Sequence, residues 1–295
     1  MITLFFQHPI ALVGYVLLIL AILSIWIHPK IWMWGPLFGA SGVFAYFGHV
    51  LDPAGLIPLA IVGTAYYIAS RNISGFTRLF VVMIAAIITI GIYTHFVKGF
   101  HNLLVAANWQ RSPDAQTINI YANYDKAAVA LLILGLYFHR PIQSKKELYS
   151  MLAKTLPWML FAAIILLPLS QFLEMVHWDP KLPLITPTWL VLQIFFAAIP
   201  EEVFYRGFLQ REIALRLNNP MAGPFAVLIV SLLFALLHLF FVPQLTFVLA
   251  AFVASLLYGT IYQLTGRIES AILTHLFVNI CHFFFFTYPV LANVS

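Results

Sequence analysis

Long apolar runs separated by short polar turns make up most of this chain. A helix needs about 20 apolar residues to cross the hydrocarbon core of a membrane. We predict spans near residues 9–27, 31–50, 54–70, 77–96, 127–139, 152–175, 187–209, 222–241, 245–264 and 268–289. The expected fold is therefore all-α, a polytopic transmembrane helix bundle of about 8–10 spans.

The longest polar stretch runs from Lys98 to Lys126 and separates two groups of spans. We expect residues 1–100 to form an N-terminal extension of about four helices. Residues 101–150 would be a polar connection with one short span, and residues 151–295 the functional core. The start of the chain carries no Lys or Arg before its first apolar run, unlike a cleavable signal peptide, so the first span is expected to be retained.

Composition agrees with a membrane protein and excludes several other classes. The chain is 62% hydrophobic and 8% charged, whereas a soluble domain carries roughly a quarter charged residues. The single cysteine, Cys281, excludes an intramolecular disulfide and is expected to be a packing residue. In a membrane protein a net charge of +5 reports orientation, so no nucleic-acid partner is expected.

The loop charges predict the orientation of the spans. If the ten spans alternate, one side holds four cations, namely Lys98, Arg111, Lys126 and Lys181. The other side holds nine, namely Lys30, Arg71, Arg78, Arg140, Lys145, Lys146, Arg211, Arg216 and Arg267. The side richer in Lys and Arg should be cytoplasmic, so both termini are expected to be extracytoplasmic. Short loops and a lone cysteine suit a bacterial inner membrane.

Polar residues inside the predicted spans are concentrated towards the C-terminus. An ionised group in the hydrocarbon costs about 2.5–3.5 kcal/mol on insertion scales. Apart from His49 and His95, the first four spans are nearly free of acidic and basic residues, whereas the last four contain Glu201, Glu202, Arg206, His238, His275, Asn279 and His282. Because such residues usually mark a function, we expect the active region within residues 150–295.

Two adjacent glutamates and an arginine form the first motif, within Pro200–Gly207. Successive residues of a helix point about 100° apart, so Glu201 and Glu202 cannot share one face. Glu202 and Arg206 are four residues apart, in the order that favours an ion pair. Glu201 is then left to face elsewhere, where a buried carboxylate can serve as a base. The alternative is a helix end at the membrane surface, with Arg206 reaching to the headgroups.

Two further motifs have the same four-residue spacing, Phe234 with His238 and His275 with Asn279. Each pair projects from one face of its helix. The alternatives are structural: a histidine satisfied within the core, and an asparagine that hydrogen-bonds a neighbouring helix for about 1 kcal/mol or less. A carboxylate, two imidazoles and a carboxamide together can activate water and hold an oxyanion, which indicates peptide hydrolysis.

Other classes of function are less well supported by the residues. The chain has no nucleophile-elbow serine, no Walker-type glycine loop and no paired cysteines. A transporter or channel could use intramembrane Glu, His and Arg as an ion path, but the two halves of the chain carry no paired broken helices. A non-enzymatic scaffold that retains the fold is the third alternative.

The three motifs, in this order and spacing, resemble the CAAX protease and bacteriocin-processing family, whose members are similar to the type II CAAX prenyl protease, or Ras-converting enzyme. The resemblance covers roughly residues 187–285. It implies a glutamate-dependent intramembrane endopeptidase, in which Glu201 and His238 activate the water. His275 and Asn279 would then stabilise the oxyanion.

The resemblance also implies the roles of the remaining motif residues. Glu202, Arg206 and Phe234 would orient the site. No cofactor is expected, with zinc held by Glu201, His238 and His275 as the alternative, although no His-Glu-x-x-His helix is present. The expected partners are membrane lipid and a membrane-associated or lipidated peptide substrate, with a prenylated protein among the candidates. The sequence does not predict the oligomeric state.

Overall fold

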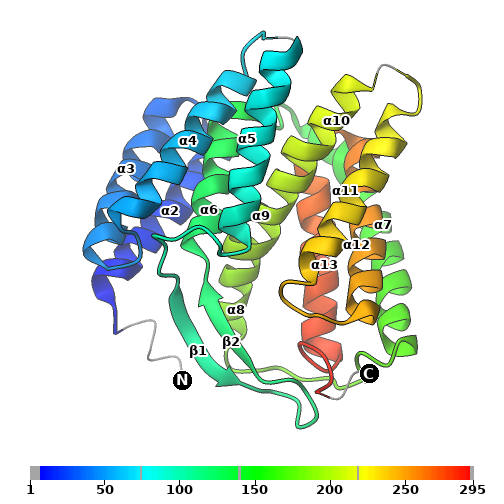
Figure 1. Cartoon of the computed structure of the whole chain (residues 1–295). Helices are drawn as coiled ribbons and strands as arrows, with labels where there is room; N and C mark the ends of the chain where they lie inside the picture. Colours follow the sequence, from blue (N-terminus) through cyan, green and yellow to red (C-terminus); the bar gives the residue numbers. More distant parts are fainter. Residues whose placement is uncertain (1–6, 74, 139–140, 218, 293–295) are drawn as a thin grey trace. The chain divides into compact units, whose positions relative to one another are not determined.

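The computed structural model describes residues 7–73, 75–138, 141–217 and 219–292, most of which are helical. Six helices in these ranges are long and apolar enough to cross a membrane. They are α2 (Pro9–Ile27), α5 (Gly75–Tyr93), α7 (Lys145–Phe172), the composite helix Thr186–Arg216, α12 (Leu245–Thr265) and α13 (Ile268–Phe285). Two shorter apolar helices, α4 (Pro53–Ala69) and α11 (Ala222–His238), add to them (Figure 1). The predicted all-α, multi-pass membrane bundle is confirmed.

Each of the predicted spans coincides with a helix. The match includes α3 (Ile31–Phe47) and the short helix α6 (Tyr124–Leu132), which continues as the π-helical segment η1 (Ile133–Tyr137). The predicted end of that span, His139, and the loop residue Arg140 lie outside the described residues. Apolar length alone was sufficient to locate these elements, because a helix in lipid satisfies its own backbone hydrogen bonds.

The start of α6 differs from the prediction. We expected the span to begin at Ala127, with Lys126 in a loop, but the helix begins at Tyr124 and includes Asp125 and Lys126. Asp125 is 1% exposed and Lys126 is 8% exposed. Lys126 therefore does not belong among the loop cations that were used to predict orientation.

The polar stretch before α6 contains a β-hairpin that the sequence analysis missed. Strands β1 (Leu103–Trp109) and β2 (Ile118–Ala122) form a two-stranded sheet (Figure 1). The second strand, Ile-Asn-Ile-Tyr-Ala, alternates apolar and polar residues, as a strand with one buried face does. Only five residues carry this pattern, so it is a weak signal beside the long apolar runs.

The helix that carries the glutamate motif is not a regular α-helix. It runs through α8 (Thr186–Gln193), η2 (Ile194–Ala198), α9 (Ile199–Glu202), η3 (Val203–Gln210) and α10 (Arg211–Arg216), and both η segments are π-helical. Pro200 lacks the N–H group that would donate to the carbonyl of the preceding turn, and this breaks the regular ladder beside η2. Segments of π-helix are frequent at functional sites.

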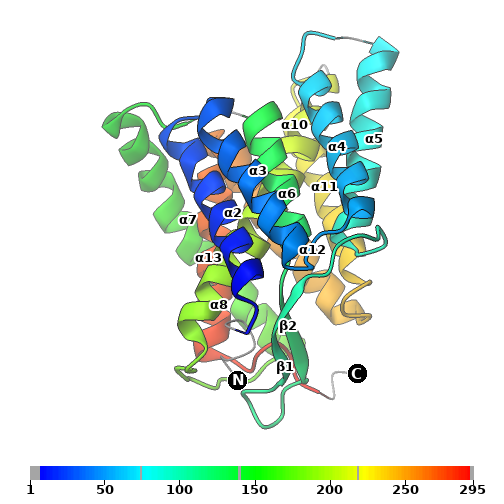
Figure 2. The same ribbon diagram turned by 90° about the vertical axis from the view of Figure 1, so that its left-hand side faces the viewer.

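The chain divides into two compact units, and the composite helix contributes to both. The first unit contains Met1–Ala106, Ile120–Ile142 and Phe195–Phe204. Within it α2 and α3 lie side by side (Figure 2), and their backbones approach closely at small residues. A β-carbon on Gly48 would lie 2.6 Å from the Cα atom of Ala11, so this contact requires glycine.

The second unit contains Ala107–Asn119, Gln143–Ile194 and Tyr205–Ser295. Its helices α7, α11, α12 and α13 pack together, with α7 against both α12 and α13. Trp158 of α7 donates to the carbonyl of Leu257 at 3.0 Å, and Thr155 of α7 donates to Ser270 at 2.8 Å. Polar contacts of this kind join helices where lipid supplies no hydrophobic driving force.

Candidate active site

The glutamate segment belongs to the first unit. Glu202 is fully buried, whereas Glu201 is only partly buried. Their different exposure follows from the change of direction between adjacent helical residues, as the sequence predicted. Of the two carboxylates, Glu201 is therefore the one with exposed surface.

A tyrosine of the N-terminal helices anchors the backbone just before Glu201. The hydroxyl of Tyr93, at the end of α5, donates to the carbonyl of Pro200 at 3.0 Å. Its ring lies 5.4 Å from that of Phe204, so the tyrosine contacts the glutamate segment on both sides of the two carboxylates. The N-terminal helices thus help to fix the segment that carries the motif.

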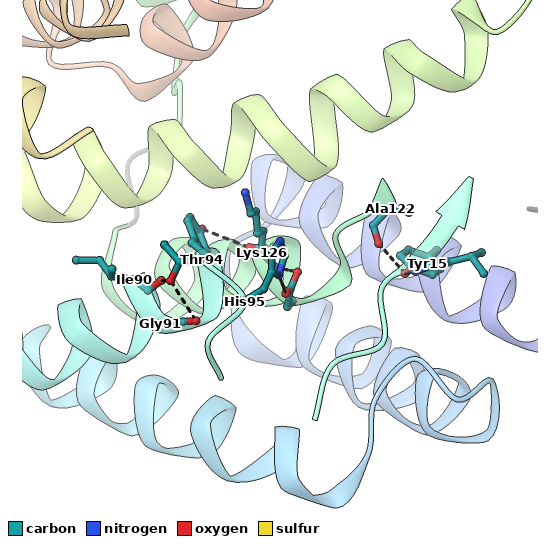
Figure 3. A network of polar contacts seen from close by, with 10 residues as sticks. Tyr15, Ile90, Gly91, Thr94, His95, Ala122 and Lys126 are labelled. Carbon is teal, nitrogen blue, oxygen red and sulfur yellow. Dashed lines mark hydrogen bonds and ion pairs between the residues drawn. The ribbon is translucent and has the colours of Figure 1, made fainter. Parts of the chain in front are cut away.

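The same tyrosine contacts the polar first turn of α6. The Tyr93 hydroxyl lies 3.4 Å from the carbonyl of Lys126, and the Lys126 ammonium lies 5.6 Å from the centre of the tyrosine ring. Beside them, Nδ1 of His95 is 3.1 Å from Oδ2 of Asp125 (Figure 3). These contacts satisfy ionisable groups that would be costly if left isolated in a membrane helix.

Arg206 lies in the second unit and is fully buried. Its Nη2 atom donates to the Ser255 hydroxyl at 2.8 Å and to the Ser255 carbonyl at 3.1 Å. Its guanidinium carbon also lies 5.1 Å from the ring centre of Phe234 and 5.6 Å from that of Tyr258. The arginine therefore links η3 to α11 and α12, which supports an orienting role.

His238 has one tautomer favoured by its backbone contact. Its Nδ1 atom is 2.7 Å from the carbonyl oxygen of Phe234, one turn earlier in α11. A carbonyl can only accept, so Nδ1 carries a proton and Nε2 of the neutral ring has the lone pair. The two rings lie 4.3 Å apart, so Phe234 positions the imidazole through both its carbonyl and its side chain.

His275 is held by an aromatic residue that the sequence analysis did not identify. It is 6% exposed, and its ring stacks on that of Tyr258 at 4.8 Å with an angle of 14°. Because Arg206 contacts the same tyrosine ring, Tyr258 joins the first and third motifs to each other. Within the second unit, the structure thus brings together Arg206, His275 and the Phe234–His238 pair.

Asn279 is oriented by a glutamine, also not predicted. Nδ2 of Asn279 donates to Oε1 of Gln193 at 3.0 Å. A carboxamide nitrogen carries two hydrogens, so this bond fixes the plane of the amide and retains a second donor. Gln193 could have been identified from the sequence as an amide side chain within an apolar run. No feature of the sequence distinguishes Tyr258 or Tyr93 from other tyrosines in apolar helices.

Metal ligands are not assembled among the residues that the structure describes. No three His, Cys, Asp or Glu side chains there gather closely enough to hold a metal ion. The zinc alternative draws Glu201 from the first unit and His238 and His275 from the second, so it stays a prediction, and we derive no step through a metal. His282 follows His275 by seven residues on α13, and its Nε2 atom lies 3.0 Å from the carbonyl oxygen of Thr287.

The comparison with protein families agrees with the motifs. Residues 183–281 match the model described as Type II CAAX prenyl endopeptidase Rce1-like. No curated protein and no solved structure matches the chain. The matched segment contains all three motifs, and the Rce1-like family consists of intramembrane endopeptidases. Over residues 183–281 the chain is therefore similar to the Rce1-like endopeptidases, and it is a multi-pass membrane peptidase.

Proposed function

We propose that this protein is a glutamate-dependent intramembrane endopeptidase that hydrolyses a peptide bond of a membrane-associated substrate. The observation that carries the proposal is the match over residues 183–281, which includes Glu201, His238, His275 and Asn279. The different burial of the two adjacent glutamates supports the choice of Glu201 as the reactive carboxylate. Convergence of Glu201 with the two histidines is part of the proposal.

Glu201 and His238 would activate the water. The Glu201 carboxylate removes a proton as the water oxygen attacks the scissile carbonyl carbon. Nε2 of neutral His238 accepts a hydrogen bond from the same water, since Nδ1 is committed to Phe234. Holding the water between two acceptors directs a lone pair of its oxygen at the carbonyl.

His275 and Asn279 would bind the oxyanion. As the C–O bond to water forms, the former carbonyl oxygen becomes negative and accepts hydrogen bonds from these two side chains. The tetrahedral intermediate then collapses, the C–N bond breaks, and the leaving amine takes the proton that Glu201 had removed. Gln193 and Tyr258 would act as positioning residues, because they contact Asn279 and His275.

Glu202, Arg206 and Phe234 are proposed to orient the site and not to contact the substrate. Complete burial of Glu202 and Arg206 supports this role. The predicted ion pair between them is part of the proposal. Zinc-dependent hydrolysis remains the alternative version of the same reaction, and chelation distinguishes the two.

The substrate and the setting are proposed on the same grounds. A membrane-associated peptide, with a prenylated or otherwise lipidated protein as the first candidate, suits an active site inside the membrane. We further propose a bacterial inner membrane with both termini extracytoplasmic, because Lys and Arg favour one set of loops. Residues 1–100, 101–150 and 151–295 are proposed as extension, connection and core.

The test is cleavage of a fluorogenic peptide by the purified protein, with and without a prenyl group, together with a library of co-expressed membrane substrates. Glu201→Ala and His238→Ala should each abolish cleavage, and a chelator should leave the wild type unchanged. Lys98→Ala, at an exposed loop position of the first unit, is the control.

Other results would identify the alternatives. Loss of cleavage on chelation with recovery on adding zinc would establish the metal-dependent version. Absence of cleavage for every substrate would contradict the protease proposal. Ion flux through reconstituted vesicles would then favour a transporter, and absence of flux a scaffold.

A further inference from the structure

A polar cavity of about 420 Å³ lies in the second unit, away from the motif residues, where the start of α7 meets the turn between α12 and α13. Its lining includes three cations and three hydroxyl groups. They are Lys146, Lys154 and Arg267, and Ser144, Ser150 and Thr265. A cavity with this lining favours a small ligand that is anionic and accepts several hydrogen bonds.

The helical repeat of α7 brings part of the lining together. Lys146, Ser150 and Lys154 are spaced at four-residue intervals, so they share one face of the helix. Ser144 is the N-cap of this helix, and its hydroxyl accepts from the backbone N–H of Glu147 at 3.2 Å. The partial positive charge at the start of this long helix adds to that of the lysines.

The α12–α13 turn supplies the opposite wall. Gly266 ends α12 in the left-handed conformation, with φ of 64°, which a residue with a β-carbon rarely adopts. Arg267 follows, and its backbone N–H donates to the Thr265 hydroxyl at 3.2 Å. The turn therefore holds Thr265 and Arg267 in fixed positions facing α7.

The charges of the lining do not cancel. Arg267 forms an ion pair with Glu147, the carboxylate of the lining. In the part of the chain that the structure describes, no carboxylate forms an ion pair with Lys146 or Lys154. Two positive charges thus remain available to a ligand on the face of α7.

The depth of the cavity indicates which anion it meets. The stretch Thr155–Phe172 of α7 carries no charged residue and is about 27 Å long at 1.5 Å per residue, close to the roughly 30 Å thickness of the hydrocarbon core. Lys154 therefore lies at the edge of the hydrocarbon, and Lys146 lies two turns beyond it. That is the level of the phosphates of membrane lipids.

We propose that this cavity binds a phosphate group, as presented by the headgroup of an anionic phospholipid. Lys146 and Lys154 contact the phosphate oxygens, and the hydroxyls of Ser144 and Ser150 donate to them. The pair formed by Arg267 and Glu147 keeps the back of the site in place. A volume of about 420 Å³ exceeds the roughly 30 Å³ of one water molecule many times over, so a headgroup has room.

The experiment measures binding of short-chain phosphatidylglycerol to the full-length protein in a neutral detergent by native mass spectrometry. Phosphatidylcholine is the zwitterionic comparison, and inorganic phosphate is the competitor. The test variant is Lys146→Gln with Lys154→Gln. The matched control is Lys98→Gln with Lys145→Gln, which removes the same charge from exposed lysines outside the cavity lining.

We expect the test variant to bind phosphatidylglycerol roughly 25-fold more weakly, from about fivefold for each cation lost. The control should stay within about twofold of the wild type, and unchanged unfolding midpoints would show that both variants fold. Displacement of the lipid by millimolar inorganic phosphate would support the site and assign it to a soluble phosphate. Equal weakening in both variants, or no weakening in the test variant, would overturn the proposal.

Discussion

Replacement of Gln193 by leucine should lower turnover about fivefold and leave substrate binding unchanged. Oε1 of Gln193 accepts a hydrogen bond from Asn279 at 3.0 Å, and both groups are neutral. A neutral hydrogen bond contributes about 1 kcal/mol. Without it, the carboxamide of Asn279 turns more freely and spends less time with its second N–H directed at the oxyanion.

The magnitude follows from this energy. At 1.36 kcal/mol for each factor of ten in rate, about 1 kcal/mol corresponds to roughly a fivefold loss. Asn279→Leu removes the donor itself and should cost about 100- to 1,000-fold, the usual range for one oxyanion donor. Because Gln193 acts through Asn279, its own effect must be much the smaller of the two.

The assay is a double-mutant cycle. Initial rates give kcat and KM for the wild type, Gln193→Leu, Asn279→Leu and the double variant. In the Asn279→Leu background, Gln193→Leu should change kcat by less than about twofold, since there is no amide left to orient. Gln171→Leu, at the exposed end of α7, serves as the control for loss of a glutamine.

Two results would refute this reasoning. A fivefold loss in both backgrounds would show that Gln193 acts independently of Asn279. A rise in KM with unchanged kcat would mean that Gln193 contributes to binding of the substrate, not to the transition state.

Three further predictions concern the supporting contacts. Arg206→Met should lower the unfolding midpoint in detergent, since it removes two bonds to Ser255, each worth about 1.5–3 kcal/mol when charged. Tyr93→Phe removes the donor to the Pro200 carbonyl and should reduce kcat severalfold with KM unchanged. Hydrogen bonds from Ser112 and Lys181 hold the pKa of Asp179 below its ordinary value of 3.8. The stability advantage of the wild type over Asp179→Asn should therefore be constant above about pH 5 and shrink as the pH falls through the lowered pKa.

For each of these three predictions, one result would contradict it. An Arg206→Met variant with the wild-type midpoint would show that the buried guanidinium does not stabilise the second unit. Wild-type turnover in Tyr93→Phe would mean that the carbonyl of Pro200 needs no anchor. An advantage over Asp179→Asn that grows in acid would reverse the sign of the linkage.

The sequence predicted the helices well because apolar length is a local property. Pro9–Ile27 was located at both ends, since nothing outside the segment is needed to specify a helix in lipid. The hairpin was missed because its second strand, Ile118–Ala122, is short, and strand pairing depends on residues elsewhere in the chain. The π-helical segments were missed because each span was assumed to keep a regular α-helical pitch along its length.

The candidate site was predictable only in part. Glu201, Arg206, His238 and His275 stood out because charged or titratable groups are costly in a span. Tyr258 did not, because a tyrosine in an apolar helix is ordinary; its place between Arg206 and His275 arises only from packing.

The most direct test of the account compares two variants at adjacent positions, Glu201→Gln and Glu202→Gln, in one cleavage assay with chelator present. If Glu201 is the general base, Glu201→Gln should lose activity by about 10²–10⁴-fold and keep the wild-type unfolding midpoint. Glu202→Gln, at a fully buried position, should lower the unfolding midpoint. At temperatures below that lowered midpoint, its turnover should stay within about tenfold of the wild-type turnover. Retained cleavage in Glu201→Gln, with cleavage lost in a folded Glu202→Gln, would contradict the account.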